Sequence, residues 1–127
     1  MLRVLSAICA VVALFACSPD GTSAFNRDIP ANAVIIDVRT AEEFASGHFP
    51  GAINIPHDRI VEALTTSSLP PRAPLVLYCR SGNRSGIAEA TLRSAGFSQL
   101  QNGGDLQSLL AVHQQTMVTP GSAAPQR

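Results

Sequence analysis

One stretch of the chain combines a cysteine with a basic, glycine-containing loop. Cys79 directly follows the apolar run 75–78, which is typical of a buried strand, and precedes a segment with helical spacing at 87–93. A cysteine at this point of a strand–loop–helix unit faces backbone N–H groups and a helix N-terminus, both of which favour negative charge. The pattern therefore predicts a thiolate that acts on an anionic substrate.

The loop after Cys79 supplies the other candidate site residues. Two arginines in it carry positive charge that could hold the oxygens of an anion, and its glycine permits a tight turn. The predicted substrate-binding residues are Arg80, Ser81, Gly82, Asn83, Arg84 and Ser85. The alternative is that Cys79 is an inert core thiol. A polar, doubly basic loop is an unusual setting for such a residue, so the loop favours a functional role.

The first sixteen residues have the pattern of an export signal. Arg3 precedes a nearly unbroken apolar run at 4–16, which is too short to span a bilayer comfortably. The run ends in Leu14-Phe15-Ala16-Cys17, which resembles a bacterial lipoprotein processing box. We therefore expect an exported, periplasmic protein that is lipidated at Cys17 and meets a membrane only through that anchor. Cleavage at an ordinary signal site nearby, giving a soluble periplasmic protein, is the alternative.

The composition narrows the possible functions. Cys9 would leave with the signal and Cys17 would carry lipid, so Cys79 would be the only thiol of the folded part. A single thiol is not a disulfide framework. The histidines do not recur at metal-ligand spacing, so we predict neither a metal site nor a cofactor. The formal net charge is 0 and the chain has no basic block, which disfavours a nucleic-acid partner.

The predicted organisation is a signal peptide at 1–16, a flexible tether at 17–28, one globular domain at 29–118 and a disordered tail at 119–127. A chain of 127 residues has room for one ordinary domain, and we expect a monomer.

Within the domain, strand-like runs at 34–38, 52–55, 75–79 and 98–101 alternate with helical runs at 41–45, 57–64, 85–95 and from 106 onward. Thr40 is a candidate helix cap, and Gly103-Gly104 precedes the last helix. The alternation predicts an α/β fold with a small parallel sheet and helices on both faces. Ligands of such sheets bind at the carboxyl ends of the strands, where Cys79 falls.

Four motifs, in order along the domain, resemble those of the rhodanese family of sulfurtransferases in its single-domain, periplasmic form. They are Ile36-Asp37-Val38-Arg39 with Glu42-Glu43-Phe44, then the runs 47–56, 76–85 and 100–106. The resemblance implies a rhodanese-like fold and sulfur transfer in two displacements. Cys79 would attack the outer sulfur of a small anionic donor such as thiosulfate, release sulfite and hold the sulfur as a persulfide. Cyanide or a thiol would then accept it.

Two other functions remain open. A cysteine phosphatase can share this general fold, but its loop places five residues between cysteine and arginine. Here four residues separate Cys79 from Arg84, which gives a smaller cradle suited to sulfur. The second alternative is a non-catalytic rhodanese-like module that binds a partner or senses redox state. The presence of Cys79 in a basic loop argues against it, whereas a persulfide carrier remains compatible with the sequence.

Three polar residues outside the loop are predicted to be structural. Asp37 and Arg39 alternate along one strand and share a face, so we expect them to form a hydrogen bond or an ion pair. His48 lies in a turn with Pro50 and Gly51. A preformed thiolate needs no general base, so we expect His48 to stabilise this turn.

Overall fold

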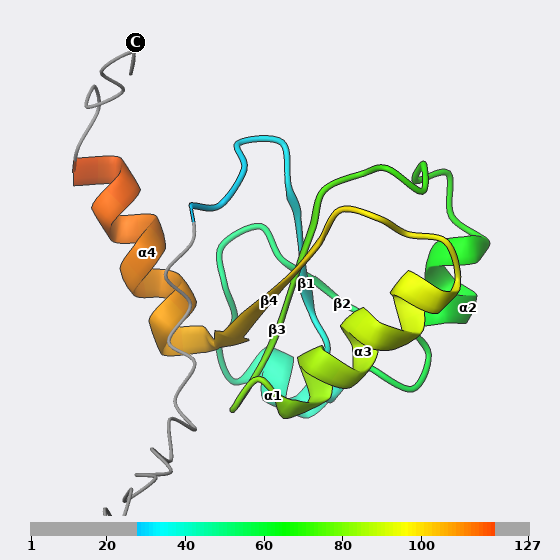
Figure 1. The fold of residues 1–127 in the computed structure, drawn as a ribbon. Coiled ribbons are helices and arrows are strands. Elements are labelled where there is room, and N and C mark those ends of the chain that lie inside the picture. The colour runs from blue at the N-terminus through cyan, green and yellow to red at the C-terminus, as the bar shows by residue number, and fades with distance from the viewer. Residues whose placement is uncertain (1–27, 119–127) are drawn as a thin grey trace, which may run out of the picture.

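The computed structural model describes residues 28–118, and Figure 1 shows their arrangement. Four strands form one sheet in the order β2-β1-β3-β4, and every neighbouring pair is parallel. The strands are β1 (Val34–Asp37), β2 (Ile53–Asn54), β3 (Leu75–Cys79) and β4 (Leu100–Asp105). The helices are α1 (Ala41–Ala45), α2 (Ile60–Thr65), α3 (Asn83–Ser94) and α4 (Leu106–Val118). Strand and helix alternate as predicted.

The predicted signal, the lipidation site Cys17, the tail at 119–127 and all but the last residue of the tether lie outside the described residues. Within 28–118, no helix combines the length and the apolar character needed to cross a membrane.

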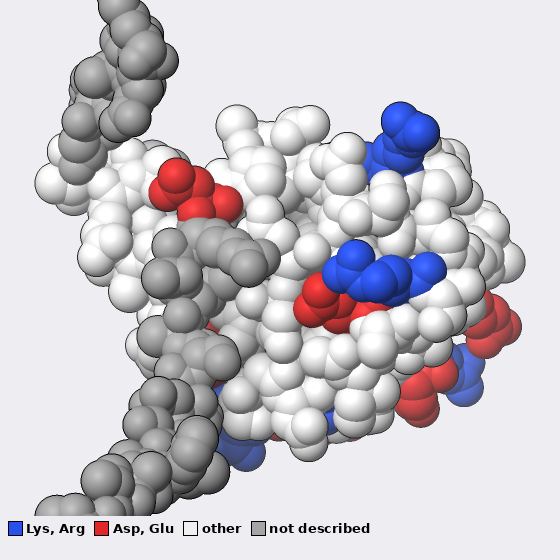
Figure 2. Space-filling view, viewed as in Figure 1, with Lys and Arg blue, Asp and Glu red and all other residues white. Residues whose placement is uncertain are grey.

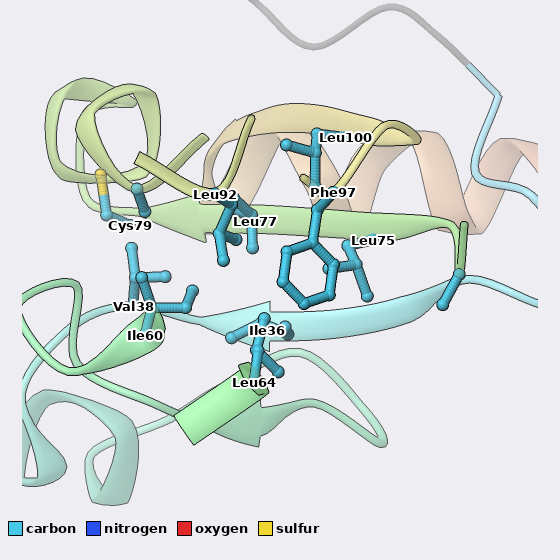
Figure 3. Packing of buried hydrophobic residues seen from close by; sticks show 12 residues of the cluster. Ile36, Val38, Ile60, Leu64, Leu75, Leu77, Cys79, Leu92, Phe97 and Leu100 are labelled. Atoms are coloured by element: carbon cyan, nitrogen blue, oxygen red, sulfur yellow. The ribbon is translucent and has the colours of Figure 1, made fainter. Parts of the chain in front are cut away.

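Side chains of the central strands alternate between the two faces of the sheet, so each face has its own apolar core. On one face, Ile36 and Leu77 pack with Leu92 of α3, as Figure 3 shows. On the other face, Tyr78 belongs to a cluster with Leu109 of α4. The helices therefore cover both faces, as predicted, and all five residues of β3 are buried. This burial fixes the strand that ends at Cys79.

Two helices begin at residues other than those predicted. Helix α2 was expected from 57, but residues 57–59 form a turn whose first N–H, from His57, donates to the carbonyl of Val38 at 3.1 Å. Helix α3 begins at Asn83, two residues before the predicted start at 85. Gly82 is its N-cap residue, with φ of +87°. The chain therefore reaches the N-cap of α3 three residues after Cys79.

The last strand differs most from the prediction. We expected a strand at 98–101 and a last helix after Gly103-Gly104, but β4 begins at Leu100 and runs through both glycines to Asp105. A Cβ on Gly103 would lie 3.1 Å from Val76 Cγ1 and 3.2 Å from the Leu77 carbonyl oxygen. Glycine is therefore present because β4 and β3 approach closely, not because the strand ends. The predicted end at 101 was wrong.

The polar residues below the site are structural, as predicted. Arg39 Nη2 lies 2.6 Å from Asp37 Oδ2, and the Tyr78 hydroxyl donates to the same oxygen at 2.8 Å. Asp37 is completely buried, so these contacts satisfy a charge that water cannot reach. His48 stacks on Phe44 with 3.7 Å between ring centroids, and its Nδ1 lies 2.9 Å from the Phe44 carbonyl oxygen. It stabilises the turn after α1.

Candidate functional site

Cys79 is the last residue of β3, and the loop that follows it folds back over its sulfur. The side chain is buried within the core cluster on the α3 face. The backbone N–H of Gly82 donates to Sγ at 3.1 Å. The positive φ of Gly82 directs this N–H while the chain turns into α3. The loop and the helix start thus place donors around the sulfur, as predicted from the strand–loop–helix pattern.

The surroundings of Cys79 favour its thiolate form. Burial raises the pKa of the thiol, but hydrogen bonds from the Ser85 hydroxyl and from the N–H groups of Ser85, Ser81 and Gly82 lower it. The hydrogen bonds outweigh burial, so the pKa of Cys79 lies below its ordinary value. The main lowering of this pKa therefore comes from the hydrogen bonds of Ser85 and of the loop N–H groups.

Ser85 connects the sulfur to the neighbouring strand. Ser85 is completely buried, and its hydroxyl oxygen lies 3.5 Å from Cys79 Sγ and 2.7 Å from Asn102 Oδ1, so its single proton can be donated to one of these two atoms at a time. Asn102, on β4, also accepts the N–H of Gly104 at 2.9 Å and donates to the carbonyl of Gly82 at 3.0 Å. One amide therefore holds the middle of the loop, the helix start and the strand in a fixed relation.

Asn102 is a site residue that the sequence interpretation missed. It was noted only as part of the motif at 100–106, because the strand was expected to stop before it. Its position on a strand next to β3, immediately before two glycines, is the signal that would have found it. The parallel register pairs Asn102 with Leu77, two residues before Cys79.

The two arginines of the loop have different surroundings. Arg84 forms a bidentate ion pair with Glu43 of α1, with Nη1–Oε2 at 2.8 Å and Nη2–Oε1 at 3.0 Å. The Arg80 side chain is 76% exposed, and its Nε lies 3.9 Å from Glu43 Oε1. The hydrogen bond from Arg84 is the largest of the contacts that lower the pKa of Glu43 to about 2. Glu43 is a second residue that the sequence interpretation did not place in the site.

The other predicted site residues lie around the same point. Ser81 is exposed and contributes its N–H, and Asn83 is exposed as the first residue of α3. Among residues 28–118, no group of three or more histidine, cysteine or acidic side chains is placed to hold a metal ion. Figure 2 shows one face of the molecule, where charged side chains lie in small separate groups on a largely uncharged surface.

Comparison with known proteins adds to this geometry. The family model described as a rhodanese-like domain matches residues 23–104. Thiosulfate sulfurtransferase PspE of Escherichia coli is 34% identical over 74 residues, which are 58% of this chain and 71% of that protein. Thiosulfate sulfurtransferase GlpE of Pseudomonas savastanoi is 37% identical over 68 residues, which are 54% of this chain and 62% of that protein.

Similarity also extends to part of a longer protein and to a solved structure. Adenylyltransferase and sulfurtransferase UBA4 of Meyerozyma guilliermondii is 36% identical over 84 residues, which are 61% of this chain but only 20% of that protein. The structure described as rhodanese with anions from E. coli has 33% sequence identity and a TM-score of 0.57, and the match covers 60% of this chain and 89% of that one.

Proposed function

Because the chain belongs to the rhodanese-like domain family, we propose that it is a sulfurtransferase that carries a sulfane sulfur on Cys79. The observation that supports the proposal is the setting of the Cys79 sulfur. The nitrogen of Gly82 lies 3.1 Å from Sγ and the hydroxyl oxygen of Ser85 lies 3.5 Å from it. Hydrogen bonds of the loop hold the pKa of Cys79 below its ordinary value. A thiolate is the nucleophile in sulfur chemistry of this kind.

In the first displacement, Cys79 Sγ attacks the outer sulfur of thiosulfate. A bond forms between the two sulfurs, and the bond from the outer sulfur to the sulfonate breaks. Sulfite leaves with the electron pair of that bond, and Cys79 becomes a persulfide. The N–H groups of Ser81 and Gly82 would stabilise the negative charge that moves from Sγ to the outer sulfur.

In the second displacement, an acceptor removes the outer sulfur. The carbon of cyanide, or the sulfur of a thiolate, attacks it. The bond between the outer sulfur and Sγ breaks, and its electron pair restores the Cys79 thiolate. The products are thiocyanate or an acceptor persulfide. No redox cofactor is needed, because the sulfane sulfur moves with balanced electrons throughout.

The arginines would have unequal roles in this reaction. Arg80 is largely exposed and contacts Glu43 only at 3.9 Å, so it can reach the sulfonate oxygens of a donor, together with Ser81 and Asn83. Arg84 is already engaged by Glu43, so its charge is available only in part. This arrangement also disfavours phosphatase chemistry, in which the arginine that closes the loop must bind phosphate oxygens.

Thiocyanate formation from thiosulfate and cyanide tests the proposal, with Cys79→Ser as the control. We expect turnover that requires Cys79, and a mass increase of one sulfur atom on Cys79 after thiosulfate treatment that cyanide removes. A folded protein with a titratable Cys79 thiol but neither result would contradict the proposal and favour a binding module. Brisk Cys79-dependent hydrolysis of an aryl phosphate would instead favour the phosphatase.

We also propose that the chain is exported and lipid-anchored at Cys17, on the sequence pattern at 14–17. Expression in a bacterium with a radioactive fatty acid should label the wild type and leave Cys17→Ser unlabelled. Equal labelling of both, or label in neither, would contradict the anchor.

A further inference from the structure

We propose that Glu43 is a positioning residue that sets how strongly the loop attracts an anionic sulfur donor, by holding the guanidinium of Arg84. The inference rests on the function proposed above and identifies a determinant of donor affinity within it. The Glu43–Arg84 pair joins α1 to the first turn of α3, across 41 residues of sequence.

The geometry of the pair supports a strong hold on the guanidinium. Two parallel N–H···O bonds, at 2.8 Å and 3.0 Å, match the planar fork of Arg84 to the two oxygens of Glu43. Both side chains are partly buried, with exposed fractions of 27% for Arg84 and 23% for Glu43. Salt therefore screens the pair less than it screens a fully exposed one.

Glu43 is itself held in place at the start of α1. Its Oε2 accepts the N–H of Thr40 at 2.9 Å, and its own N–H donates to Thr40 Oγ1 at 3.3 Å. This reciprocal capping box ties the carboxylate to the helix start, directly after the buried ion pair of Asp37 and Arg39. The carboxylate is therefore not a mobile surface group that a donor anion can easily displace.

The charge of Arg84 is thus largely offset before any substrate arrives. Hydrogen bonding to Glu43 is the main contact that raises the pKa of Arg84, and the charge of Cys79 also acts on it. In the chain, Arg84 lies between Gly82, whose N–H donates to Cys79 Sγ at 3.1 Å, and Ser85, whose hydroxyl oxygen is 3.5 Å from the same sulfur, so its charge can act on an anion bound there. Removing the negative charge of Glu43 would release this guanidinium toward the anion, whereas removing a more distant carboxylate would not.

Glu43→Gln is the informative variant, because glutamine keeps the length and the capping role of the side chain and removes its charge. Glu42→Gln is its matched control. Glu42 lies in the same first turn and loses the same formal charge, but it is exposed and is not part of the Arg84 pair. Circular dichroism and a thermal melt establish that both variants are folded.

The charge at Cys79 can be measured without sulfur transfer. Iodoacetate and iodoacetamide both alkylate the thiolate by displacing iodide, and they differ in that the first is an anion. The rate with iodoacetate divided by the rate with iodoacetamide cancels changes in the thiolate fraction of Cys79. This ratio therefore reports the local charge, and it rises when the surroundings of the sulfur become more positive. We expect Glu43→Gln to raise this ratio roughly two- to fivefold, as for release of a partly exposed pair, and Glu42→Gln to leave it near the wild-type value.

The effect must act through Arg84 if the proposal holds. In an Arg84→Gln background, Glu43→Gln should raise the ratio much less. The same increase in both backgrounds, or no increase in the wild-type background, would overturn the proposal. If Glu43→Gln does not fold, Glu43→Asp serves instead. Its shorter side chain should withdraw from Arg84 and raise the ratio by a smaller factor. An unchanged ratio in Glu43→Asp would contradict the proposal.

Turnover provides the second measurement. For thiosulfate, Glu43→Gln should lower KM by roughly the same two- to fivefold factor and change kcat less, since the released charge acts on donor binding. A purely structural role would lower stability without this split between KM and kcat. If the chain transfers no sulfur, the alkylation ratio still decides the charge inference. If it transfers sulfur and the ratio is unchanged, only this inference fails.

Discussion

The backbone N–H of Gly82 points at the sulfur of Cys79, with 3.1 Å between nitrogen and Sγ. Gly82 achieves this with φ of +87°, a conformation that side chains with a Cβ rarely adopt. It also lies against β4, where an added Cβ would be 3.3 Å from the Cα of Gly104. The same residue therefore turns the loop, caps α3 and donates to the thiolate.

Gly82→Ala should reduce stability and raise the pKa of Cys79. The left-handed backbone conformation costs about 1 kcal/mol for a residue with a Cβ, and the tight contact with Gly104 adds to it. Gly51→Ala is the matched control, because Gly51 has φ of +77° and nothing within 4 Å of an added Cβ. Denaturant unfolding and the pH dependence of iodoacetamide alkylation measure the two effects. A thiol pKa that rises equally in both variants would contradict the assigned role of the Gly82 N–H.

Ser85→Ala should shift the alkylation profile of Cys79 to higher pH. The Ser85 hydroxyl is one of the groups that lower the pKa of this thiol, so its removal leaves less thiolate at a given pH. Ser94→Ala on the same helix is the control, because the Ser94 hydroxyl donates to the carbonyl of Ala90 and not toward the site. Identical profiles for Ser85→Ala and the wild type would show that the 3.5 Å contact does not support the thiolate.

The sequence predicted the location of Cys79 because local patterns determine it. An apolar run fixes β3, and the polar loop after it marks the carboxyl end of the strand. The Thr40 cap was likewise predictable, since capping depends on residues three positions apart, and the structure confirms it.

The partners of the loop were not predictable in the same way. Glu43 meets Arg84 because β1 and β3 are neighbours in the sheet, which brings the starts of α1 and α3 to one edge. This depends on strand order, which no local pattern encodes. Asn102 was missed for a related reason. The strand was expected to end at 101, before Gly103-Gly104, whereas close packing of β4 on β3 requires a glycine at 103 within the strand.

Tyr78→Phe should destabilise the fold by about 1–3 kcal/mol, as expected when buried polar groups lose a partner. The Tyr78 hydroxyl donates to Asp37 Oδ2 at 2.8 Å and accepts the N–H of Phe49 at 2.9 Å. The substitution keeps the packing of the ring, so the loss isolates these two hydrogen bonds. Denaturant unfolding at neutral pH measures it. An unchanged free energy of unfolding would show that water or a shifted Asp37 replaces the hydroxyl.

Glu43 should also make stability depend on pH in the acid range. Hydrogen bonding to Arg84, supported by the N–H of Thr40, lowers the pKa of Glu43 from its ordinary 4.5 to about 2 in the folded state. A carboxyl group whose pKa falls on folding adds stability above its unfolded pKa, and this stability is lost as pH falls through the folded value. The contribution of Glu43 should therefore be complete above about pH 4.5 and fade toward pH 2.

The difference in unfolding free energy between the wild type and Glu43→Gln isolates this contribution, because other acidic groups titrate alike in both proteins. We expect the wild type to be the more stable at pH 6 and the difference to shrink steadily as pH falls toward 2. Glu42→Gln, which removes an exposed carboxylate outside the Arg84 pair, is the matched control. A wild-type advantage that persists undiminished at low pH would mean that glutamine disturbs the packing of α1, and that the ion pair with Arg84 is not its source.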